Sequence, residues 1–136
     1  VAPDVVVSVD TFRSEVARRS IEQAGAIIVN DISAGEADVA MVDVVAHYGV
    51  PYVAMHMRGT PQTMQQYTGY ERGVVAEVAD YFRRRTEWLR ERGVKDIILD
   101  PGFGFAKSLE QNYEFFVSNP LDFFHISFYN VNISIS

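Results

Sequence analysis

Four polar side chains with binding chemistry each follow a short apolar run of the sequence. Asp10 ends VVVSVD, Asn30 ends AIIVN, His56 ends YVAMH and Asp100 ends DIILD. The carboxylates and the carboxamide in this set can bind amide or amidine hydrogen-bonding patterns. An aspartate pairs in bidentate fashion with an amidine-like ring edge, as it does with a guanidinium. The pattern therefore predicts a ligand site built on the ends of strands.

Each of these residues also has a plainer structural interpretation. Asp10 is a good helix cap, and Asn30 with Asp31 suits a turn after a strand, so capping is favoured for either one taken singly. Two such strand ends in succession favour a ligand. His56 is either a structural histidine or part of a binding loop, because methionines flank it and methionines commonly fill cores. A metal role for His47 with His56 is disfavoured, since their spacing crosses two elements.

The segment LDPGFGFAKS after the last apolar run gives the strongest signal. Its proline cannot continue a strand, while Gly102 and Gly104 allow the backbone to approach a ligand closely. The rings of Phe103 and Phe105 then pack over a planar group beside Asp100. The third glycine of a nucleotide-binding G-x-G-x-x-G is missing. The alternative is a loop tied down for structural reasons alone.

Regular elements must hold these residues in place. Four nearly continuous apolar runs are typical of parallel strands covered on both faces, and helical periodicity fills the segments between them. The predicted strands span residues 5–9, 26–29, 52–55 and 96–99. The predicted helices span residues 11–24, 38–48 and 70–92, and end at Gly25, Gly49 and Gly93.

This alternation predicts an α/β fold with a parallel sheet and right-handed crossovers. A doubly wound sheet and a (β/α)8 barrel both fit the alternation. A polar residue at the end of every strand favours the barrel, because all its strand ends face one mouth. A whole barrel needs about 250 residues. The 136 residues of this chain therefore suffice for about half of one.

Composition narrows the class of protein. The net charge of −6 argues against non-specific nucleic-acid binding, and the run Arg83-Arg84-Arg85 is expected to form a solvated helix face. No apolar run approaches the roughly 20 residues of a membrane span. The absence of cysteine excludes disulfides and thiolate chemistry. We expect a soluble, cytoplasmic protein. Its first residues have neither an initiator methionine nor the pattern of a signal peptide, so we expect them to come from the middle of a longer protein.

Four ordered motifs, SVDTFRSEVA, IVNDISAG, MHMRGTPQTMQ and LDPGFGFAKS, resemble the dihydropteroate synthase family. The resemblance implies a (β/α)8 TIM barrel, of which this chain would supply roughly strands 3 to 6. Residues 1–116 would form a partial pterin-binding barrel domain, and residues 117–136 form a tail that does not resemble the family. The implied activity is that of a transferase in folate biosynthesis. It condenses 6-hydroxymethyl-7,8-dihydropterin pyrophosphate with p-aminobenzoate to dihydropteroate.

The resemblance also implies a pterin pocket on this chain. Its polar members would hydrogen-bond the pterin, with Asp100 on the 2-amino/N3 edge, while Ile32 and Met55 would pack on the ring. The family reaction is thought to lose pyrophosphate before the amine attacks, so no side chain of this chain is assigned a catalytic role. The implied substrate-binding residues are Asp10, Asn30, Ile32, Met55, Asp100, Gly104 and Phe105.

The family further implies Mg²⁺, but the region that binds it falls outside this chain, so no residue here is assigned to a metal. The implied partners are the two small-molecule substrates and a second copy of the protein, with no nucleic acid and no membrane. Two alternatives stay open: a methyltetrahydrofolate-binding methyltransferase domain, and a catalytically inactive truncated fragment. We expect the 136 residues alone not to catalyse the full reaction.

Overall fold

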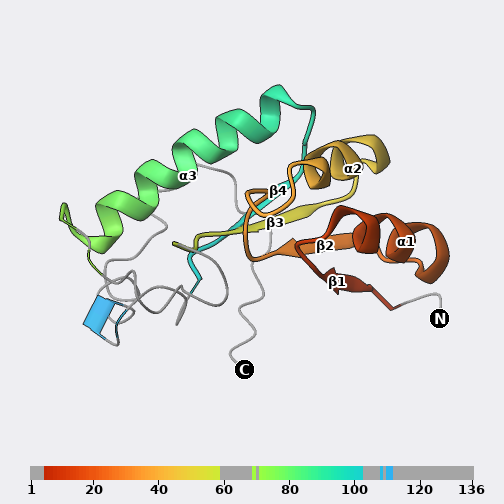
Figure 1. Ribbon diagram of the computed structural model, residues 1–136, viewed down its shortest axis with the longest axis horizontal. Coiled ribbons are helices and arrows are strands. Elements are labelled where there is room, and N and C mark those ends of the chain that lie inside the picture. The colour runs from red at the N-terminus through yellow and green to blue at the C-terminus, as the bar shows by residue number, and fades with distance from the viewer. Residues whose placement is uncertain (1–4, 59–68, 70, 103–107, 109, 112–136) are drawn as a thin grey trace.

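Strands and helices alternate along the whole described part of the chain, as the sequence predicts. The computed structural model describes residues 5–58, 69, 71–102, 108 and 110–111. The strands are β1 (Ser8–Asp10), β2 (Ile28–Asp31), β3 (Tyr52–Met55) and β4 (Ile97–Asp100). The helices are α1 (Ser14–Ala24), α2 (Ala40–Tyr48) and α3 (Val74–Glu91) (Figure 1).

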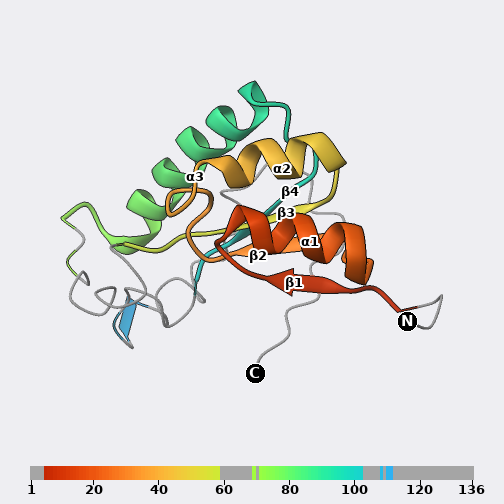
Figure 2. The same ribbon diagram turned by 45° about the vertical axis from the view of Figure 1, so that its right-hand side comes forward.

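The four strands form one parallel sheet in the order β1-β2-β3-β4. All three helices lie on the same side of it (Figure 2). Strands that follow one another in order, with every crossover helix on one face, are the pattern of a (β/α)8 barrel. A doubly wound sheet instead reverses its strand order and covers both faces. The barrel interpretation of the sequence is therefore the one that the topology supports.

The larger of two hydrophobic clusters among the described residues joins the sheet to the helices. It is centred on Val29 and Tyr52 from the strands, Val45 from α2 and Leu89 from α3, all of them buried. Successive side chains of a strand point to opposite faces. The residues next to these core positions therefore lie on the other face of the sheet, which no helix among the described residues covers.

Three of the four strands lie closer to the C-terminus than predicted, while the prediction for 52–55 is confirmed. The apolar run at 5–9 begins before the paired part of the strand, and its first residues, Val5 and Val6, are 57% and 63% exposed. Pairing with a neighbour, and not the apolar run, decides where a strand begins. As a consequence Asp10 and Asp100 are the last residues of their strands and not the residues after them.

Helices α1 and α2 end where predicted, α3 ends one residue earlier at Glu91, and all three begin later than predicted. Gly25 and Gly49 adopt φ values of +69° and +63° after α1 and α2, the left-handed geometry of a helix C-terminus. Helix α1 begins at Ser14, whose N–H donates to Oδ2 of Asp38 at 2.8 Å. The capping carboxylate thus comes from the β2–α2 segment, which is why the local sequence around residue 11 mispredicts the start.

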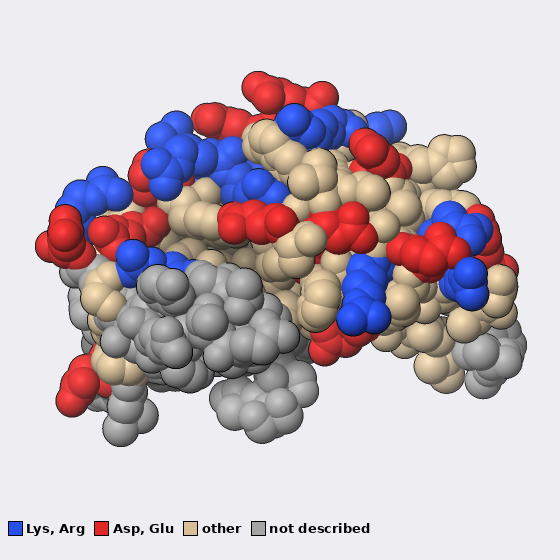
Figure 3. All heavy atoms as spheres, viewed as in Figure 1, with Lys and Arg blue, Asp and Glu red and all other residues tan. Residues whose placement is uncertain are grey.

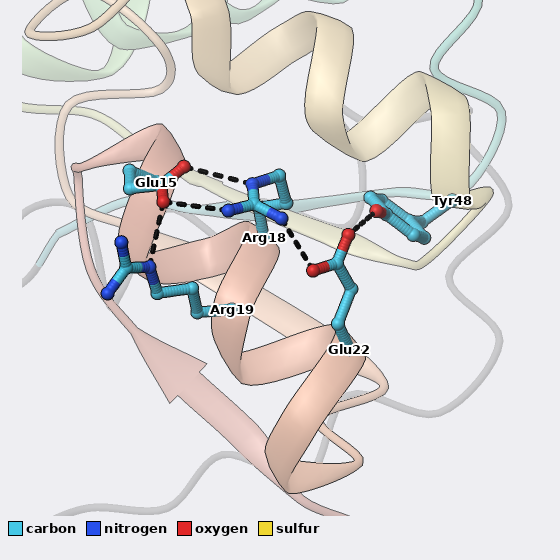
Figure 4. Close-up of polar contacts among 5 residues, drawn as sticks. All are labelled: Glu15, Arg18, Arg19, Glu22 and Tyr48. Atoms are coloured by element: carbon cyan, nitrogen blue, oxygen red, sulfur yellow. Dashed lines mark hydrogen bonds and ion pairs between the residues drawn. The ribbon is translucent and has the colours of Figure 1, made fainter.

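A surface network links the first two helices (Figure 4). Arg18 bridges Glu15 at 2.7 Å and Glu22, and the hydroxyl of Tyr48 in α2 donates to the same Glu22. Hydrogen bonds from Arg18 and Arg19 lower the pKa of Glu15 to about 2. These groups are exposed to solvent, so the network contributes little to stability.

Charges of both signs are interspersed over the face that Figure 3 shows. On α3, Asp80 pairs with Arg83 at 3.0 Å and with Arg84 at 3.1 Å. The prediction that Arg83, Arg84 and Arg85 all form a solvated face is wrong for Arg85, whose Nε donates to the carbonyl of Ala34 at 2.6 Å. None of the described helices is long and apolar enough to cross a membrane.

Candidate functional site

The predicted site residues on the strands meet at one edge and on one face of the sheet. Asp10 is the register partner of Asn30, and Met55 is the register partner of Asp100. Asn30 is also paired with Val53, which lies two residues before Met55 and so on the same face. The four side chains therefore share the face opposite the helices, at the carboxyl ends of the strands. In a barrel this position is the mouth.

Asp10 does not cap the helix that follows it. The residue before α1 is Arg13, with no side-chain cap of its own, and Asp38 supplies the carboxylate that caps Ser14. Hydrogen bonding to Ser14 lowers the pKa of Asp38. The carboxylate of Asp10 is exposed and accepts no hydrogen bond from the described residues. It is thus available to a ligand.

Asn30 and Asp31 divide the two roles that the sequence left open for the pair. Asp31 is fully buried and accepts hydrogen bonds from the amide and hydroxyl of Ser33, both at 2.8 Å, and from the amide of Gly35 at 2.9 Å. It makes the turn. The Oδ1 atom of Asn30 is buried and has no hydrogen-bond partner. An unpaired buried acceptor costs about 1–3 kcal/mol, so a donor from a ligand would stabilise this atom.

Asp100 both shapes its loop and faces the site. Its Oδ1 accepts the amide of Gly102 at 2.8 Å, and its backbone carbonyl accepts the amide of His56 at 2.8 Å. Gly102 has φ +67°, and a Cβ there would lie 2.3 Å from the carbonyl oxygen of His56. The structural and the ligand-binding interpretations of Asp100 are therefore compatible. The turn uses its Oδ1, and its Oδ2 is left for a ligand.

The methionine and histidine at the end of β3 have different surroundings. Met55 is 3% exposed and lies beside the Gly102 backbone, with its Cγ 3.1 Å from a Cβ built there. His56 is also 3% exposed, and its ring packs edge-on against Tyr81 with centroids 4.9 Å apart. This burial and ring packing are compatible with the structural alternative for His56. Ile32, directly after β2, is half-buried.

Three residues of the predicted site, Phe103, Gly104 and Phe105, lie outside the described residues. His47 is exposed on α2, whereas His56 is buried after β3. Sequence reasoning missed Tyr52, whose hydroxyl donates to Oδ2 of Asp31 at 2.6 Å. Burial first, and the neighbouring Asp31 second, raise the pKa of Tyr52. Its signal was a tyrosine in a buried strand, since a buried hydroxyl needs a partner.

Comparison with known proteins identifies the family of this chain. A family model described as pterin binding enzyme matches residues 1–136. The chain belongs to that family. A dihydropteroate synthase from Synechocystis is 45% identical over 111 residues, which are 80% of this chain and 38% of that protein. The folic acid synthesis protein fol1 of Schizosaccharomyces pombe is 47% identical over 110 residues, 79% of this chain and 15% of that protein.

Solved structures of family members match the fold as well. Dihydropteroate synthase from Thermus thermophilus in complex with 4-aminobenzoate gives a TM-score of 0.77 at 41% identity, covering 84% of this chain and 44% of that one. The partial (β/α)8 barrel predicted from the sequence is confirmed. The chain spans about two-fifths of the length of the synthases it matches. The division at residue 116 lies outside the described residues and stays a prediction.

Proposed function

We propose that this pterin-binding family member provides the pterin-recognition edge of a dihydropteroate synthase. The observation that carries the proposal is the buried, unpartnered Oδ1 of Asn30, on the same face and edge as Asp10 and Asp100. A dihydropterin offers its amino group and ring N–H groups as donors along a flat edge. Two carboxylates and one carboxamide supply matching acceptors, and Met55 supplies apolar surface for the ring.

The reaction places few demands on side-chain chemistry. The bond between the pterin methylene carbon and the pyrophosphate oxygen breaks, and the amine nitrogen of p-aminobenzoate bonds to that carbon and loses a proton. Pyrophosphate carries away the electron pair of the broken bond, so no protein nucleophile is needed. The residues of this chain bind and orient the pterin and, in this proposal, perform no covalent step.

Mg²⁺ is not assigned to any residue of this chain. Among the described residues, no three His, Asp or Glu side chains come together as a metal site. Asp10 and Asp100 lie on β1 and β4, at opposite ends of the strand order. They do not form a compact set of oxygen ligands, so no step is derived through the metal. A homodimer is carried over from the family alone, and a cytoplasmic location is only the default expectation.

The synthase is favoured over the methyltetrahydrofolate-binding methyltransferase. The relatives described above, at 45% and 47% identity, carry synthase or folic acid synthesis names. A structure of the Xanthomonas albilineans synthase, at 35% identity to this chain, contains 6-chloroguanine, a bicyclic aromatic ring that carries an amino group as a pterin does. An inactive fragment that still binds pterin would share the recognition edge and differ only in activity.

Calorimetric titration with 6-hydroxymethylpterin tests the proposal. Asp100→Asn retains an oxygen for the Gly102 amide but removes the charge, so we expect binding at least about ten-fold weaker, the loss of one charge-assisted hydrogen bond. Asp43→Asn, an exposed change on α2, is the matched control and should leave affinity unchanged. Failure of the unmodified protein to bind pterin contradicts the proposal, and stronger binding of methyltetrahydrofolate favours the methyltransferase.

A further inference from the structure

Asp31 holds the loop behind the candidate site. Its side chain is fully buried on the helix side of β2 and accepts four hydrogen bonds. Three come from the loop itself, from the amide and hydroxyl of Ser33 and the amide of Gly35. The fourth comes from the hydroxyl of Tyr52 on β3, at 2.6 Å. The loop that follows β2 is thus tied to the neighbouring strand.

Two helices fix the same loop from further out. The carbonyl of Ala34 accepts Nε of Arg85 from α3 at 2.6 Å, and Ala34 itself adopts φ +50°. Gly35 has φ +81° and is closely packed on both sides. A Cβ added to it would lie only 3.0 Å from Cγ2 of Val42 in α2 and 3.1 Å from Nη2 of Arg85. A loop in this conformation, packed this closely, has one position relative to the sheet.

Asn30 depends on that frame. Its Oδ1 has no partner, so no hydrogen bond to this atom fixes the side chain, and its backbone carbonyl is held by the amide of Thr11 at 2.9 Å. Asp31 is the next residue and points to the opposite face. We propose that Asp31 and Tyr52 are positioning residues that lock the backbone after β2 and so aim Asn30 and Ile32 at the pterin. This inference rests on the proposed function.

A direct role of Asp31 on the substrate is excluded by its surroundings. It lies on the helix-packed face, and each of its oxygens already accepts two hydrogen bonds. Burial and the hydrogen bond to Asp31 keep Tyr52 protonated, since its pKa is raised above the ordinary value. Both residues therefore act through the loop and not by contact with the ligand.

The test compares Tyr52→Phe with Val45→Ala. Tyr52→Phe removes one hydroxyl and leaves three donors on Asp31, while Val45→Ala creates a small cavity in the same core cluster and removes no hydrogen bond to the loop. We expect Tyr52→Phe to weaken 6-hydroxymethylpterin binding about five-fold and to speed amide hydrogen exchange at Ser33 and Gly35. Val45→Ala should lower the urea midpoint at least as much and leave both the dissociation constant and this local exchange as in the unmodified protein.

A second measurement separates this inference from the proposed function. The side-chain amide signal of Asn30 in ¹⁵N NMR, recorded without ligand, should shift in Tyr52→Phe and not in Val45→Ala. If the unmodified protein does not bind pterin, the proposed function fails, and a shifted Asn30 signal still supports the positioning role. Equal affinity, equal exchange and an unchanged Asn30 signal in the two variants overturn it.

Discussion

Gly102→Ala should damage stability and binding together, for a reason that can be worked from the structure. The φ of +67° costs an alanine about 1 kcal/mol, as any left-handed position does. The added Cβ would also lie 2.3 Å from the carbonyl oxygen of His56, which is backbone and cannot rotate away. Overpacking of this kind costs about 1–3 kcal/mol. The expected loss in free energy of unfolding is therefore about 2–4 kcal/mol.

Gly49→Ala isolates the steric part of this effect. Gly49 has φ +63°, nearly the same backbone conformation, but nothing lies within 4 Å of a Cβ built on it. It should lose only the conformational term of about 1 kcal/mol. Urea unfolding of the two variants, followed by far-UV circular dichroism, measures the difference.

Binding gives the second readout. To relieve the contact, the chain must move Gly102 away from the end of β3, which strains the bond from its amide to Oδ1 of Asp100. Affinity for 6-hydroxymethylpterin should fall about ten-fold or more in Gly102→Ala and stay unchanged in Gly49→Ala. If the two variants lose equal stability and bind equally well, the close approach of the loop to β3 is refuted as a determinant of the site.

Three further outcomes are expected. Asn30→Leu replaces the side chain that carries the buried, unpaired Oδ1 by an apolar group of similar size. It should leave the urea midpoint unchanged or higher and abolish pterin binding. A loss of more than about 1 kcal/mol in the free energy of unfolding would instead indicate that Oδ1 has a hydrogen-bond partner. Asp38→Ala should cost about 1 kcal/mol at pH 7 through loss of the cap on Ser14. Because the folded-state pKa of Asp38 is lowered, its contribution is present above the ordinary pKa and lost as the pH falls through the folded one, so the variant and the unmodified protein should converge in acid titrations. Arg85 and Arg92 both stack on the ring of the single tryptophan, Trp88, but only Arg85 donates to the carbonyl of Ala34. Arg85→Met should therefore lower the free energy of unfolding by about 1–3 kcal/mol and shift the tryptophan fluorescence. Arg92→Met should shift only the fluorescence.

Local signals made much of this fold predictable. Gly25 and Gly49 end their helices because left-handed backbone is easy for glycine, and that preference acts within one turn. The limits of the strands were harder, since they depend on which neighbour supplies the hydrogen bonds. The start of α1 was mispredicted for the same reason, because its cap, Asp38, lies 24 residues further along the chain.

The candidate site was only half predictable. The sequence places Asp10 and Asp100 at strand ends, and the parallel sheet then brings them to one edge. It does not say which of Asn30 and Asp31 faces the helices, because both are polar and adjacent. Only the pairing of β2 with its neighbours decides this. The role of Tyr52 was hidden for the same reason, since its partner depends on the face to which Asp31 points.

The alternation of side chains along β2 separates stability from binding in two consecutive residues. A slip of one residue in the register of β2 would turn Asp31 toward the site and Asn30 toward the helices. The slip would move Asp31 away from Tyr52 on β3 and leave the buried hydroxyl of Tyr52 without its acceptor. Each buried group left unpaired costs about 1–3 kcal/mol. The network behind the sheet therefore enforces the register that presents the unpaired amide of Asn30 in front of it.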